Sequence, residues 1–216
     1  MSWHRHHNDA EPSSSLYLIA APESAVVSLD DMKEHLRVDA DNTDDDDVID
    51  AFTAATTQHL DGRDGLLGRA LIDQTWELRL SWFPCYGLLR LPLPPLIEVV
   101  SVKYIDADGA EQIFDSDNYH VTGIGDRGWL HLGSGKAWPV LGVGWPEPAI
   151  IRFRAGYVDT TVSPEIDAVP DPIIAAIKLL TANLYENRQT IVLGQSAIQL
   201  PWAAEALLAP YRDYTR

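Results

Sequence analysis

Alternating apolar and polar positions mark the middle of the chain. From Ile72 to Leu80, every second residue is apolar except Gln74, and the positions between them are charged or hydroxyl-bearing. This period of two predicts a half-buried strand. Further strands are predicted at 88–91, 97–105, 112–114, 119–122, 129–132 and 149–157.

Turn residues separate these strands. The sequence Asp-Ala-Asp-Gly at 106–109 is typical of a hairpin between 97–105 and 112–114. Residues 133–148 contain four glycines and three prolines, a composition that predicts a loop.

Helical spacing of apolar residues flanks the strands on both sides. A first helix is expected from Ser28, which forms a capping box with Asp31 in place of the usual Glu. A second is expected over 45–60. After the strands, Asp171 is a good N-cap, Pro172 suits the first helical position, and a last helix is expected over 201–209.

The order of helices, strands and helices predicts an α+β fold. We expect a small helical bundle, made of N-terminal and C-terminal helices, with an antiparallel β-domain inserted between them. The expected division is a disordered arm at 1–15, a helical connector module at 16–68 and 165–216, and an inserted β-rich domain at 69–164.

Charge narrows the classes of function. The chain has 216 residues and a net charge of −16, which excludes a basic nucleic-acid footprint and disfavours an anionic membrane surface. Residues 1–65 carry 15 acidic and 4 basic side chains, whereas residues 171–216 carry 4 of each. The acidity is therefore concentrated in the first third.

Location can also be anticipated from composition. No apolar stretch approaches the 18 residues typical of a membrane-spanning helix, and residues 1–15 lack the apolar stretch of a signal peptide. A single cysteine, Cys85, excludes an internal disulfide framework. We expect synthesis and persistence in a reducing cytoplasm.

Motifs for catalysis and for metal binding are missing or misplaced. The acidic run Asp44, Asp45, Asp46 and Asp47 lacks the Gly and Glu that a calcium loop of the EF-hand type needs, so we expect a solvated helix start. The glycines at 123, 125 and 128 lie between two predicted strands and not before a helix. No catalytic residue, cofactor or metal is expected.

Aromatic residues leave one alternative open. Trp129, Trp138 and Trp145 cluster in the β-rich region and would suit a stacking platform of a carbohydrate-binding module. Packing within the core or between subunits is the competing explanation.

A set of short blocks, in a fixed order from about residue 16 to the end, resembles the head–tail connector (portal adaptor) proteins of tailed bacteriophages and gene transfer agents. The blocks are Ser28-Leu29 to Val38-Asp39, Gly68-Arg69-Ala70-Leu71-Ile72 with Gln74-Thr75-Trp76-Glu77-Leu78 and Phe83-Pro84, Leu91-Pro92-Leu93-Pro94-Pro95-Leu96 with Tyr104-Ile105-Asp106, Phe153-Arg154-Ala155-Gly156-Tyr157, Tyr185-Glu186-Asn187-Arg188, and Leu200-Pro201-Trp202 with Pro210-Tyr211-Arg212. The His-containing arm lies outside the pattern.

The resemblance implies a structural role without catalysis. Such adaptors form a ring, commonly of twelve copies, beneath the portal protein of a filled capsid. The ring extends the DNA channel, so duplex DNA is only non-specific cargo, and it docks a stopper or tail protein. The implied location is the neck of a virion or phage-like particle, after a bacterial cytoplasmic stage, with no membrane partner.

Two surfaces are candidates for these contacts. The charge-neutral tail, with Trp202, Leu207, Leu208, Tyr211 and Arg212, has the composition of a portal or ring interface, although packing on its own subunit explains it equally well. The acidic cluster at 44–47 is expected to face the channel or the outer solvent, because an acidic lining repels DNA phosphates.

Overall fold

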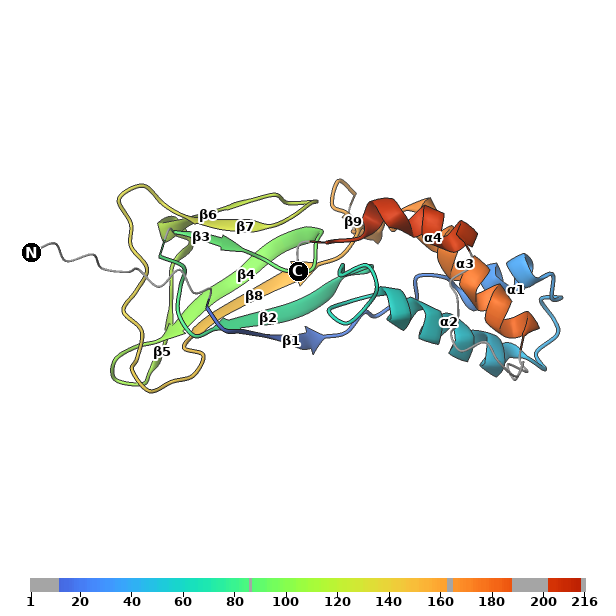
Figure 1. Ribbon diagram of the computed structural model, residues 1–216, viewed down its shortest axis with the longest axis horizontal. Coiled ribbons are helices and arrows are strands. Elements are labelled where there is room, and N and C mark those ends of the chain that lie inside the picture. Colours follow the sequence, from blue (N-terminus) through green and yellow to red (C-terminus); the bar gives the residue numbers. More distant parts are fainter. Residues whose placement is uncertain (1–11, 86, 163–164, 188–201, 215–216) are drawn as a thin grey trace, which may run out of the picture.

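The computed structural model describes residues 12–85, 87–162, 165–187 and 202–214. Two modules lie end to end, a β-domain and a helical module (Figure 1). Their strands are β1 (Ser14–Ala20), β2 (Gln74–Leu80), β3 (Leu88–Arg90), β4 (Leu96–Ile105), β5 (Glu111–Ile113), β6 (Tyr119–Thr122), β7 (Trp129–Leu132), β8 (Ala149–Ala155), β9 (Val158–Asp159) and β10 (Ile166–Asp167). Their helices are α1 (Leu29–Leu36), α2 (Asp46–Leu60), α3 (Asp171–Glu186) and α4 (Trp202–Leu208), with 3-10 turns at Ser116–Asn118 and Ala209–Tyr211.

The β-domain is a sandwich of two antiparallel sheets. One sheet has the strand order β1-β2-β8-β4-β5 and the other β3-β7-β6. Inward side chains of both sheets form one core, including Trp76, Leu89, Leu130 and Phe153. The alternation seen in the sequence thus separates core residues from outward ones.

The outward face of the five-stranded sheet carries paired charges. Glu77 is buried and bonded to Arg79 and to Arg152, each at 2.7 Å. Burial tends to raise the pKa of Glu77, but the hydrogen bonds from Arg152 and Arg79 outweigh it, and the pKa is lowered. Next to them, Arg154 bridges to three carboxylates, including Asp73 and Glu98.

The helical module has a separate core. Residues of α2, α3 and α4, such as Ile49, Ile177 and Leu208, are fully buried together. Inside it, the hydroxyl groups of Thr56 and Thr181 are 2.8 Å apart and connect α2 to α3. Because the two cores are distinct, contacts at the boundary must fix how the modules are oriented.

One buried lysine organises the start of the helical module. The Nζ of Lys33, on α1, donates to the carbonyls of Ala40 and Asn42 at 2.9 and 2.7 Å and pairs with Asp46 at 2.8 Å. Its side chain is 4% exposed. Two hydrogen bonds and one ion pair therefore hold the 37–45 loop against α1 and α2.

The predicted α+β fold is confirmed, and most elements lie close to their predicted positions. Ser28 caps α1 by accepting the N–H of Asp31 at 3.1 Å. Helix α3 begins at Asp171, one residue earlier than predicted, with Pro172 in its first turn. Residues 133–148 form a loop as expected.

The structure corrects the expected role of residues 14–20, which were placed in the disordered arm and at the start of the helical module. They form β1, which pairs antiparallel with β2. The sequence Ser-Ser-Leu-Tyr-Leu-Ile-Ala alternates only weakly, and its partner lies some 60 positions away in the chain. The β9–β10 ribbon was also missed.

Removing the Lys33 ammonium group tests the importance of the loop anchor. We predict that Lys33→Ala lowers the free energy of unfolding by about 3 kcal/mol, because Asp46 and two carbonyls lose their common partner. Urea denaturation followed by circular dichroism measures the loss. The same change at exposed Lys136 should alter stability by less than about 0.5 kcal/mol.

Candidate functional site and assembly surfaces

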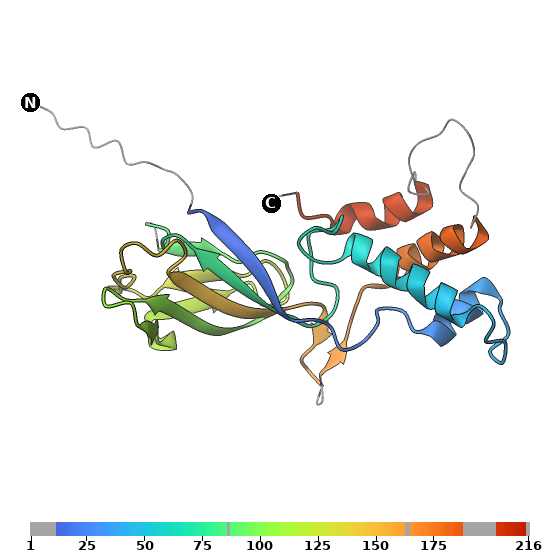
Figure 2. The same cartoon turned by 90° about the horizontal axis from the view of Figure 1, so that it is seen from below.

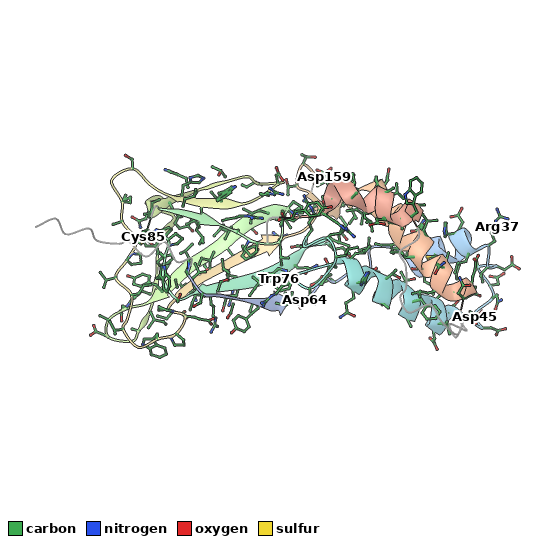
Figure 3. The ribbon with its side chains drawn as sticks, in the orientation of Figure 1. Arg37, Asp45, Asp64, Trp76, Cys85 and Asp159 are labelled. Atoms are coloured by element: carbon green, nitrogen blue, oxygen red, sulfur yellow. The ribbon has the colours of Figure 1, made fainter. Side chains whose placement is uncertain are left out.

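The acidic cluster lies at the end of the helical module that points away from the β-domain, as the position of Asp45 in Figure 3 shows. Asp45 accepts a 2.6 Å hydrogen bond from the hydroxyl of Tyr185 on α3, and Asp46 pairs with Lys33. Asp44 and Asp47 are exposed. Two carboxylates therefore hold the fold together, and two face solvent.

The C-terminal residues also divide into two groups. Leu208 is fully buried in the helical core, and Leu207 and Tyr211 pack against that core. Arg212 is half-buried, whereas the side chain of Trp202 is 83% exposed. Of the five residues predicted as an interface, Trp202 alone presents a large apolar side chain almost wholly to solvent.

The segment after α4 turns back to the boundary between the modules. Asp213 is buried and pairs with Arg90 of β3 at 2.7 Å and with Arg127 at 3.1 Å. Its N–H donates to the carbonyl of Leu67 at 2.8 Å, and Arg69 donates to the carbonyl of Tyr211. The segment at 211–213 accordingly reaches the boundary between the modules, as the end of the red trace in Figures 1 and 2 shows.

A second carboxylate connects the modules at the end of α2. Asp61 accepts the N–H of Leu71 and the amide of Gln74, both at 2.7 Å. Gln74 in turn accepts the indole N–H of buried Trp76 at 3.1 Å. We call Asp61, Asp213 and their partners the joint.

Burial raises the pKa of Asp61, and hydrogen bonds from Leu71, Gln74 and Gly62 offset this only in part. Neither Asp61 nor Asp213 was singled out from the sequence. Asp61 follows a helix and precedes a glycine, which is also the pattern of an ordinary helix end.

The described residues contain no group of three or more His, Cys, Asp or Glu side chains that could hold a metal ion. A cavity of about 180 Å³ on the charged sheet face is lined by Glu77, Arg79 and Arg152, and both arginines are paired with Glu77. A groove of about 350 Å³ between residues 22–27 and α2 is mainly apolar.

In the described part of the chain, every helix is too short or too polar to cross a bilayer.

The proposed aromatic platform does not assemble as such. Trp138 stacks on Phe83 with ring centroids 4.3 Å apart, and its indole N–H donates to the carbonyl of Pro84 at 3.0 Å. Trp129 is half-buried on β7. Trp145 is 52% exposed, close to Gly109 in the β4–β5 turn. Trp138 is therefore a packing residue, which weakens the carbohydrate-binding alternative.

Exposed apolar side chains gather on the β-domain. Among the described residues, the large apolar side chains that are exposed there are Tyr17, Leu18, Ile19, Trp82, Leu88, Val100, Ile113, Ile124, Val140, Val143 and Trp145. On α1 to α4, Trp202 is the one side chain of this kind. Surfaces able to bury apolar area against a partner thus lie mostly on the sandwich, and not on the helices as the sequence suggested.

Comparison with solved structures shows the same fold in chains of gene transfer agent (GTA) particles. A chain of the neck of an empty GTA particle, computed with C6 symmetry, matches with a TM-score of 0.71 and 21% identity, over 92% of this chain and 95% of that one. A chain of the virion of a native GTA particle matches with a TM-score of 0.69 and 23% identity, over 91% and 94%. A chain of the neck of a native GTA particle, computed with C12 symmetry, matches with a TM-score of 0.63 and 21% identity, over 92% and 94%.

No protein-family model matches the chain, and no curated protein matches it. The likeness is therefore one of fold, and it spans both modules. The resemblance in sequence implied a fold of this kind, and the GTA neck and virion chains have the same fold as this protein.

The pKa of Asp61 leads to a prediction about pH. A carboxyl group with a raised pKa in the folded state contributes stability at low pH, and this contribution is lost as pH rises through the folded pKa. We predict that Asp61→Asn gains stability relative to the wild type between about pH 3.5 and about pH 7. Melting temperatures of both proteins across this range measure the difference, and a constant difference would contradict the prediction.

The role of Asp213 can be tested by its removal. We expect Asp213→Ala to lower the free energy of unfolding by about 2 kcal/mol, a value reduced because Arg90 and Arg127 are partly exposed. Hydrogen exchange followed by mass spectrometry should show faster exchange in α4. Glu205→Ala, on the exposed side of the same helix, should leave both measurements unchanged.

Proposed function

We propose that this protein is a structural head–tail connector (adaptor) that forms an oligomeric ring under the portal of a phage-like particle. The ring extends the DNA channel and docks the next neck or tail protein. The observation that carries the proposal is the match of both modules, over 92% of this chain and 95% of the other, to a chain of a GTA particle neck.

A ring of twelve copies is the assembly we favour. The C12 and C6 symmetries under which the similar neck structures were computed support several copies around one axis. A closed ring needs heterologous contacts, in which one face of a copy meets a different face of its neighbour. The protein would act in the particle neck, after synthesis in a bacterial cytoplasm.

The acidic cluster is assigned to the channel or the outer solvent. Asp44 and Asp47 are exposed at the end of the helical module, whereas Asp45 and Asp46 are engaged by Tyr185 and Lys33. Exposed carboxylates repel phosphates and release no counterions from DNA, so the duplex passes as non-specific cargo.

The C-terminal helix is assigned to contact with the portal protein or with a neighbouring copy. Trp202 would be the anchor, because a large exposed indole gains most from burial in a partner's pocket. Leu207, Leu208, Tyr211 and Arg212 would position the helix that carries it.

Binding to the portal protein tests this function. The chain is mixed with the portal protein encoded by the same genome, and the mass of the complex is measured by sedimentation. We expect a complex with several copies of the chain per portal, and Trp202→Ala should weaken it roughly 30-fold, as expected for an interface hot spot of about 2 kcal/mol.

The matched control is Ile124→Ala, which removes an exposed apolar side chain of the β-domain, outside the C-terminal helix, and should bind normally. Absence of any complex between the wild-type chain and the portal protein would contradict the proposed function. Normal binding by Trp202→Ala would contradict the assignment of the anchor alone.

A further inference from the structure

The five-stranded sheet is open, with β1 at one edge and β5 at the other. We propose that the β1 edge of one copy pairs with the β5 edge of a second copy, so that the sheets of neighbouring copies join. This inference rests on the proposed function, because it presupposes copies arranged side by side around an axis.

The backbone of β1 offers unused pairing groups at its outer edge. Ser81 donates its N–H to the carbonyl of Ser13 at 3.0 Å, and Ser14 lies opposite Leu80. Since antiparallel pairs alternate, residues 13, 15 and 17 direct their backbone groups to β2, and residues 14, 16 and 18 direct theirs outward. Within the described residues, no strand pairs with this side of β1.

The side chains of β1 do nothing to protect that edge. Residues 12–22 contain no charged side chain, and their only prolines are Pro12 and Pro22, at the two ends of the segment. Tyr17, Leu18 and Ile19 are each 46–47% exposed. Proteins usually protect a free edge with charges, prolines or a covering segment, so an edge of this kind indicates a strand-pairing partner.

The opposite edge also has outward pairing groups, although β5 has three residues and carries the charged Glu111, which pairs with Lys103. Phe114 donates to the carbonyl of Val102 at 2.8 Å, and Asp106 donates to that of Ala110 at 2.9 Å. By the same alternation, Glu111 and Ile113 direct their backbone groups away from β4. Ile113 is 67% exposed.

A loop without charges lies near the β4–β5 turn. In residues 137–146, Val140, Val143 and Trp145 are exposed at 81%, 99% and 52%. The N–H of Gly142 donates to the carbonyl of Ile105 at 2.8 Å, on the side of β4 that faces away from β5, so the loop is not part of the free edge. We call the outer side of β5 the β5 edge.

The topology suits a head-to-tail contact between copies. Four antiparallel steps separate β1 from β5, so the two strands run in the same direction within one copy. If neighbouring copies are related by rotation about an axis parallel to the strands, β1 of one copy would then lie parallel to β5 of the next. In such a pair, Leu16 or Leu18 lies between the outward groups of Glu111 and Ile113, which are two residues apart.

Each edge can be blocked without breaking the fold. The N–H of Leu18 points outward, so Leu18→Pro removes an edge donor and keeps the β1–β2 ladder. Ile113→Lys places a charge on the β5 edge. Ile124→Lys is the matched control, because Ile124 is equally exposed (63%) but belongs to neither edge.

Oligomer formation is measured by sedimentation velocity, with and without the portal protein, after circular dichroism has verified folding. We expect Leu18→Pro and Ile113→Lys each to weaken self-association at least tenfold, and Ile124→Lys to leave it unchanged. A mixture of Leu18→Pro and Ile113→Lys copies should form dimers and stop there, because each pair retains one intact junction.

Other occupants of the β1 edge give other results. A β1-to-β1 contact would abolish association in Leu18→Pro and spare Ile113→Lys, and a different protein at the edge would leave self-association unchanged in both. Either result would contradict the pairing of β1 with β5. The proposed function would still hold if the wild-type chain forms a ring on the portal protein. If the wild-type chain forms no oligomer with or without the portal protein, both the pairing and the proposed function are contradicted.

Discussion

Two carboxylates of the joint, the buried Asp213 and the half-buried Asp61, orient the two modules against each other. The sandwich and the helices have separate hydrophobic cores, so apolar burial stabilises each module but does not orient one against the other. Asp61 and Asp213 supply that orientation, since each binds groups of both modules or of the loops between them. Asp213 pairs with two arginines, whereas Asp61 accepts from neutral donors, so a charge pair forms only at Asp213.

A fixed orientation has a consequence for assembly. The acidic helix start lies at one end of the molecule, and the exposed apolar edges lie on the sandwich at the other (Figures 1 and 3). A subunit of a ring must present its contact surfaces at one constant angle, or the ring would not close. In the proposed ring, the joint would supply the constant angle between the modules that a heterologous contact needs.

Local patterns in the sequence were sufficient for most of the fold. The Ser28 cap, the alternation over 72–80 and the Asp-Ala-Asp-Gly turn are signals that depend on neighbouring residues, and the structure contains each of the corresponding elements. Strand β1 was missed because its pairing with β2 depends on a distant segment. The contacts of Lys33 and Asp213 were missed for the same reason.

The candidate surfaces could be predicted only in outline. Composition identified the acidic run and the aromatic tail, but it could not separate Asp44 from Asp46, or Trp202 from Leu208, because burial depends on tertiary packing. The sheet edges could not be predicted from the sequence for a further reason. An edge is defined by strand order, and the strand order β1-β2-β8-β4-β5 joins segments that are scattered between residues 14 and 155.

The most direct measurement is a cryo-EM reconstruction of the neck of particles released by cells that encode this protein. The account predicts a ring of density directly beneath the portal into which both modules fit, in the relative orientation that the joint fixes. A neck whose density is fully explained by other proteins would contradict the central claim.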